Sequence, residues 1–305
     1  MSTSAAASPV AVRIYVANLI AQMAIVFTGG IVRLTGSGLG CPTWPECVEG
    51  SYAPTARQAQ AWHKYVEFGN RLLTFILVAL AIAAIVVAIQ DARRRRRANL
   101  HARPVVTTLA FIPIIGTVAQ AIIGGVTVLV GLHPIFVSLH FLASMAIVAG
   151  CVALVTRATD AGDGRPELLV RREIRIMTWV LIATTALLVF VGTLVTGSGP
   201  YSGDAAHENR YSFDPRTLSW LHADLVLLFI GLTVGLILAL SVTDAPRRAT
   251  KAAWHLLGAA VLQGVLGYVQ YFTGEPVVLV ATHLLLSTVV WVGALFLLRP
   301  QRVRT

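Results

Sequence analysis

Residues 66–90 read VEFGNRLLTFILVALAIAAIVVAIQ, and this stretch decides the fold because its apolar run is long enough to cross a bilayer as one helix. A helix rises about 1.5 Å per residue, so roughly 20 apolar residues span the hydrocarbon core. Similar runs recur along the chain. The eight predicted spans are residues 12–33, 66–90, 104–130, 135–156, 174–196, 218–242, 251–272 and 277–298.

The overall composition agrees with these spans. Of the 305 residues, 56% are hydrophobic and 12% are charged, which excludes a water-soluble domain. We therefore expect an all-α integral membrane protein. The first apolar run has no cleavage site of small residues after it and continues into a full span, so we expect it to remain in the mature protein.

The positive charge is concentrated in alternate loops. The net charge is +10, and the Arg and Lys clusters lie in residues 93–103, 157–175, 247–251 and 299–304. Basic loops face the cytoplasm, so the pattern predicts a multi-pass protein of the cell membrane with both termini cytoplasmic. We interpret these runs as topology signals beside anionic lipid headgroups, with no nucleic acid partner.

The two halves of the chain repeat each other. TGSG occurs at residues 35–38 and again at 196–199, each time at the end of a predicted span. Gln120 and His140 are 20 residues apart, as are Gln263 and His283. The repeat predicts two tandem, pseudo-symmetric bundles of four transmembrane helices, formed by residues 1–160 and 161–305.

The repeat also defines a layer of four equivalent positions, one near the outer end of each of four spans. These positions are Asn70, His140, His222 and His283. A single histidine in a membrane helix is commonly a packing residue, but this coincidence in depth and repeat position favours a functional site. His222 and His283 belong to one half, and two facing imidazoles are the axial ligands that bind a haem iron.

Other ligands and roles are weighed against this interpretation. Zinc is disfavoured because no cysteine or carboxylate cluster completes a tetrahedral site at that depth. Gln120 and Gln263 either orient a ligand or bond across helices. Four glycines either allow close helix packing or make room for a flat ligand: Gly124, Gly125, Gly264 and Gly267.

Together these residues resemble the haem A synthases, eight-helix membrane enzymes that convert haem O to haem A for cytochrome oxidase. The resemblance covers nearly the whole chain. It rests on GGIVRLTGSGLGCPTWPEC (29–47), on the EFGNR opening of the second span (67–71), on the second TGSG, and on the histidines of the fourth, sixth and eighth spans.

The resemblance implies a role for each matching residue. His222 and His283 would hold a haem b, whereas His140 and Asn70 would lie at the substrate haem. Glu67 matches a glutamate important for activity, so it is the candidate catalytic residue. Cys41 and Cys47 match a cysteine pair that would form a disulfide on the outer face. The implied reaction oxidises a methyl group of haem O to a formyl group by successive hydroxylations, with oxygen from water.

The chain departs from the family pattern at one position. The family commonly reads E-x-x-H-R where this sequence reads EFGNR, so Asn70 replaces a histidine. The substrate iron is then five-coordinate, water-bound or held by another side chain, because an amide is a poor iron ligand. His63 and His133 lie seven residues before Asn70 and His140. They either contact the haem edge or are interface histidines.

The charged residues beside this layer also have two interpretations. Glu67 either pairs with a basic residue of the outer loop or manages protons and positions water during the oxidation. Arg71, with Arg33 and Arg216, either binds haem propionates or reaches lipid phosphates.

Three functions compete. The preferred one is a haem A synthase that takes haem O, with haem O synthase and a membrane electron acceptor as partners. The alternative is a quinol-linked haem b electron-transfer protein without haem-modifying activity. A transporter is disfavoured because the spans lack paired Gly or Pro interruptions at the midplane.

Overall fold

The computed structural model describes residues 7–201, 203–204 and 209–304. The helices in these ranges are α1 (Pro9–Leu34), α2 (His63–Arg97), α3 (Pro104–Leu109), α4 (Ile112–Leu129), α5 (Pro134–Thr159), α6 (Arg172–Ser198), α7 (Pro215–Ser241), α8 (Arg247–Phe272) and α9 (Val277–Phe296). Two short strands, β1 (Glu167–Leu168) and β2 (Arg302–Val303), pair antiparallel.

Eight of the described segments are long and apolar enough to cross a membrane, because α3 and α4 together form one span from Pro104 to Leu129. The predicted class, an all-α integral membrane protein, is confirmed. Large apolar side chains point outward along the helices, among them Phe75, which is 71% exposed, and Val278, which is 73% exposed. Such side chains are costly in water and favourable against lipid.

The helix ends follow local chemistry. Ser8 caps α1 by accepting from the Ala11 N–H at 3.2 Å, and Asp214 caps α7 by accepting from the Thr217 N–H at 2.9 Å. α2 continues to Arg97, beyond the predicted end at residue 90. Four arginines occupy its last turn, where the negative end of the helix dipole favours cations.

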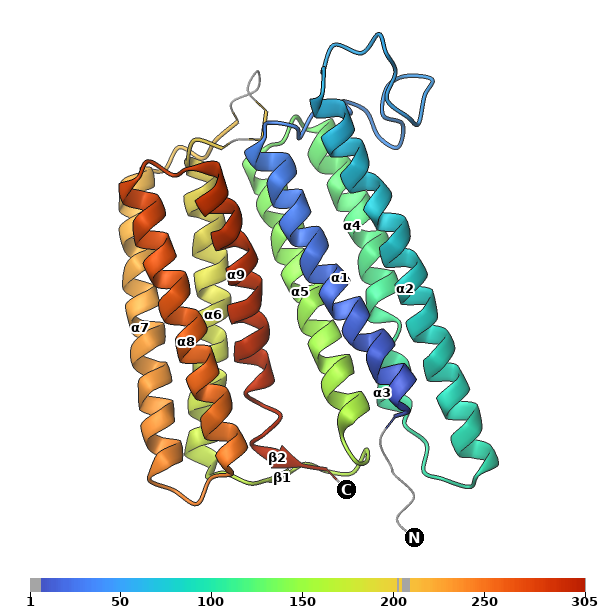
Figure 1. Cartoon of the computed structure of the whole chain (residues 1–305), viewed down its shortest axis with the longest axis vertical. Coiled ribbons are helices and arrows are strands. Elements are labelled where there is room, and N and C mark those ends of the chain that lie inside the picture. Colours follow the sequence, from blue (N-terminus) through green and yellow to red (C-terminus); the bar gives the residue numbers. More distant parts are fainter. Residues whose placement is uncertain (1–6, 202, 205–208, 305) are drawn as a thin grey trace.

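The helices form two groups that lie side by side (Figure 1). In the first group α1 packs against α2 and α5, and α4 packs against the same two helices, so α2 and α5 are diagonal to each other. In the second group α6 and α8 each pack against α7 and α9, which are therefore diagonal. The assignment of residues 1–160 and 161–305 to separate functional modules remains a prediction.

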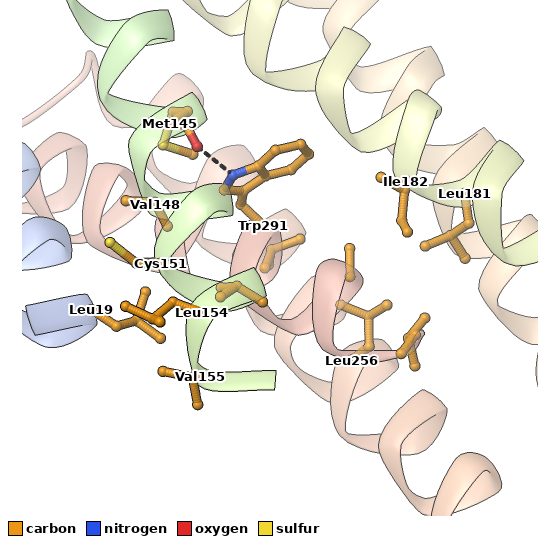
Figure 2. Close-up of a cluster of buried hydrophobic side chains, with 14 of the residues drawn as sticks. Leu19, Met145, Val148, Cys151, Leu154, Val155, Leu181, Ile182, Leu256 and Trp291 are labelled. Carbon is orange, nitrogen blue, oxygen red and sulfur yellow. Dashed lines mark hydrogen bonds between the residues drawn. The ribbon is translucent and has the colours of Figure 1, made fainter. Parts of the chain in front are cut away.

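One apolar core runs through both groups. It includes Leu19 of α1, Cys151 of α5, Leu181 of α6 and Leu256 of α8. Figure 2 shows Trp291 of α9 between the groups, with its indole N–H donating to the Met145 carbonyl of α5 at 2.9 Å. The two groups therefore share a packed interface formed by α1, α5, α6 and α9.

Polar contacts join the groups at both ends of the bundle. We call the end that carries residues 35–62 the loop end. There the Arg33 guanidinium donates to the carbonyls of Tyr201 (2.8 Å) and Thr196 (3.0 Å). At the opposite end, Asp160 lies 2.9 Å from Arg302 and 3.4 Å from Arg157. This second contact ties the end of α5 to the C-terminal strand.

Replacing Asp160 with asparagine is expected to lower the thermal stability of the protein. Arg157, Arg302 and Arg304 all lie within ion-pair distance of this carboxylate, whose side chain is 9% exposed. Hydrogen bonds to charged groups contribute about 2 kcal/mol each, so the loss should appear as a lower Tm in a thermal-shift assay in detergent. Asp244→Asn is the control, because Asp244 is exposed. Equal Tm values for the two variants would contradict the prediction.

Candidate functional site

The four layer positions each face a glycine of a neighbouring helix. An added Cβ on each glycine would lie next to the side chain opposite. Measured from the added Cβ, the distance is 3.9 Å at Gly29 to Asn70 Nδ2 and 3.0 Å at Gly124 to His140 Cε1. It is 3.4 Å at Gly192 to His222 Cε1 and 3.1 Å at Gly267 to His283 Cε1. The two positions of each group lie on diagonal helices. The predicted layer is therefore built from equivalent contacts in both groups.

The three imidazoles have unused hydrogen-bonding atoms. Nδ1 of His140, His222 and His283 is buried, and none has a hydrogen-bond partner among the described residues. Buried polar atoms are nearly always paired in folded proteins, so unpaired imidazoles indicate a ligand that the chain itself does not supply.

The glutamines of the layer bond across helices. Gln120 Nε2 donates to the His140 carbonyl at 3.0 Å, and Gln263 Nε2 donates to the His283 carbonyl at 2.9 Å. Each glutamine thus ties the backbone of a histidine to the helix before it, α4 to α5 and α8 to α9. Of the two roles left open by the sequence, the structure supports the bond between helices.

Asn70 has a partner that the sequence analysis missed. The Thr28 hydroxyl of α1 donates to Asn70 Oδ1 at 2.7 Å. Thr28 lies beside Gly29, the glycine that faces Asn70. No spacing rule in the sequence singles out Thr28, because its role depends on how α1 packs against α2.

Glu67 and Arg71 hold the loop between α1 and α2. Glu67 Oε2 accepts from the Cys41 N–H at 2.6 Å, and Oε1 accepts from Arg71 Nη2 at 2.6 Å. Arg71 also donates to three loop carbonyls, those of Cys41 (2.9 Å), Thr43 (3.1 Å) and Glu46 (3.2 Å). The partner of Glu67 is thus a residue of its own helix, and the Arg71 donors are largely used by the protein.

Cys41 and Cys47 form a disulfide, and both are fully buried. Trp44 lies within this disulfide loop, and its ring packs so closely on Gly125 of α4 that a Cβ there would overlap it. Gly124, the neighbour of Gly125, faces His140. The disulfide loop therefore covers α4, the helix that lies against His140. Trp44 is a second residue that the sequence did not predict. A tryptophan between two prolines in CPTWPEC was the available signal.

The remaining candidates lie at the loop end of the bundle. His63 Nδ1 is 3.0 Å from the Ser37 hydroxyl, and its ring stacks on Trp62 with centroids 4.0 Å apart. His133 precedes α5 and lies edge-on to Phe136. These contacts support the interpretation of His63 and His133 as interface histidines. Arg216 is exposed in the first turn of α7.

The fold and the layer together define a class of protein. It is a multi-pass helical membrane protein whose bundles contain buried imidazoles without a hydrogen-bond partner among the described residues. The COX15-CtaA model, described as cytochrome oxidase assembly protein, matches residues 12–296. The chain belongs to this family.

Curated relatives agree with the family. The haem A synthases of Lysinibacillus sphaericus and Listeria monocytogenes are each 29% identical over 183 residues, which cover 59% of this chain and 56% of theirs. That of Geobacillus kaustophilus is 26% identical over 157 residues, 48% of this chain and 45% of its own. The chain thus matches about half the length of these relatives.

Proposed function

We propose that the protein is a haem A synthase that oxidises the methyl group of haem O to a formyl group for cytochrome oxidase. The observation that carries the proposal is the layer of three unpaired imidazoles, each facing a glycine, in a chain of this family. An imidazole nitrogen suits iron, and each glycine makes room for the imidazole ring that lies against it.

His222 and His283 would hold a haem b as its two axial ligands. Both residues fit this role, because they lie on diagonal helices and each has a buried Nδ1 without a partner among the described residues. The bond from Gln263 to the His283 carbonyl fixes the backbone of one ligand. A haem held in this way supplies one-electron redox chemistry.

The substrate haem would bind between His140 and Asn70 in the first group of helices. Two hydroxylations of the methyl group give a geminal diol, which loses water to leave the formyl group. The net change adds one oxygen from water and releases four protons and four electrons, which a membrane electron acceptor takes up. We propose that this site faces the outer side of the cell membrane, with both termini in the cytoplasm and haem O synthase as a partner.

Glu67 is the proposed catalytic residue of this site, managing protons or positioning the water. Both of its oxygens accept hydrogen bonds, from the Cys41 N–H and from Arg71. The same bonds hold Glu67 against the disulfide loop. The position of the loop and the proposed catalytic role therefore depend on the same residue.

The test is to express the chain in a host that makes haem O but lacks its own haem A synthase, and to separate the extracted haems by chromatography. We expect haem A together with its hydroxylated intermediate. Folded protein that carries haem b but yields neither product would contradict the proposal. That result would favour the alternative, a quinol-linked haem b electron-transfer protein.

A further inference from the structure

We infer that Thr28 is a positioning residue that aims the Asn70 amide at a small ligand of the substrate iron, on the face opposite His140. The inference rests on the proposed haem site in the first group of helices. It assigns this site one protein ligand, His140, and one hydrogen-bond donor, Asn70 Nδ2. The second group has two imidazoles instead, so the two sites differ in what they can bind.

The placement of Asn70 follows from the packing of the helices. α2 and α5 are diagonal, because each packs against both α1 and α4. Asn70 on α2 faces Gly29, as His140 on α5 faces Gly124. Asn70 and His140 therefore lie on diagonal helices of the first group, as His222 and His283 do in the second group.

The orientation of the amide follows from its hydrogen bonds. Thr28 donates to Asn70 Oδ1 at 2.7 Å, whereas its contact with the Ile25 carbonyl is 3.3 Å. An amide whose oxygen is taken by a donor presents its NH₂ group to what remains around it. Nδ2 has no hydrogen bond to any described residue, and it is the Asn70 atom nearest the notional Gly29 Cβ.

The chemical consequence is an open position on the iron. An amide is a poor iron ligand, so His140 alone would leave the opposite face to a small molecule such as water. An N–H group there stabilises an oxygen or fluoride ligand by a hydrogen bond. Water is the proposed oxygen source, so Asn70 would hold the ligand that the reaction consumes.

The test uses the full chain loaded with ferric protoporphyrin IX to two haems per chain and titrated with fluoride. Fluoride binds a ferric haem only where an axial position is not held by a strong protein ligand, and it accepts hydrogen bonds. We expect one fluoride per chain, followed by the high-spin charge-transfer absorption. Asn70→Leu should weaken fluoride binding about tenfold through loss of one hydrogen bond, and Thr28→Val should weaken it severalfold.

Two further variants and one control distinguish a loss of Asn70 positioning from a general loss of protein structure. Thr28→Ser keeps the hydroxyl and should restore the affinity for fluoride. Asn70→His should give a six-coordinate low-spin haem that binds no fluoride. Thr184→Val is the matched control, because among the described residues the Thr184 hydroxyl bonds only to the Val180 carbonyl of its own helix. The fluoride affinity of this variant should be unchanged.

Three results would overturn the inference. They are wild-type affinity in Thr28→Val, no fluoride binding by the wild type, and failure to load the second haem. None of these measurements depends on haem A formation. If the chain made no haem A but bound fluoride as described, the synthase proposal would fail and the role of Thr28 would stand.

Discussion

Alanine in place of His222 or His283 is expected to abolish the low-spin spectrum of the proposed haem b. The two imidazoles lie on diagonal helices, and either substitution would leave the iron of the proposed haem b with a single protein ligand. We expect the haem content of the purified protein to fall by about one haem per chain, or the remaining haem to become high-spin. Reduced-minus-oxidised spectra and haem extraction measure both quantities.

The control for these variants is His255→Ala. His255 lies on α8, is exposed, and is not part of the layer. Its spectrum should match that of the wild type. An unchanged low-spin spectrum in both His222→Ala and His283→Ala would exclude these residues as the axial ligands.

Glutamine in place of Glu67 is expected to lower haem A formation by a factor of about 100 or more, the usual size of general acid–base effects. The haem b spectrum should not change, because Glu67 lies in the first group of helices. Glutamine can still accept from the Cys41 N–H, but it removes the charge that pairs with Arg71. We therefore also expect faster reduction of the Cys41–Cys47 disulfide by a water-soluble phosphine.

These two readouts test the two roles of Glu67 separately. Wild-type activity in Glu67→Gln would exclude a role in the oxidation. A wild-type reduction rate would show that the charge of Glu67 is not needed to hold the disulfide loop. Glu46→Gln is the matched control, because within the described part of the chain the Glu46 side chain bonds only to the exposed N–H of Gly50.

The helices were predictable because membrane spans depend on one property, the length of an apolar run. The predicted span 277–298 differs from α9 by two residues at its C-terminal end, and 104–130 differs from the α3–α4 span by one. The larger error, at the end of α2, arose because arginines outside the hydrocarbon layer continue a helix without adding hydrophobicity. Hydropathy does not detect such turns.

Much of the layer was also visible in the sequence, because the repeat places Asn70, His140, His222 and His283 at matching positions. The residues that support the layer were not. Thr28 reaches Asn70 from another helix, and Trp44 reaches Gly125 from the disulfide loop. Contacts of this kind depend on the rotation of each helix about its axis, which a run of uniformly apolar residues does not specify.

The adjacent glycines of α1 bear on how electrons would cross the protein. Gly29 faces Asn70 at the proposed substrate site, and Gly30 lies so close to Leu284 of α9 that a Cβ there would overlap it. Leu284 follows His283, the proposed haem b ligand. α1 therefore lies at the interface between the two proposed redox centres, together with α5, which also packs directly on α9. Bulk added at Gly30 would lengthen the tunnelling distance between them and slow the transfer of each electron released by the substrate.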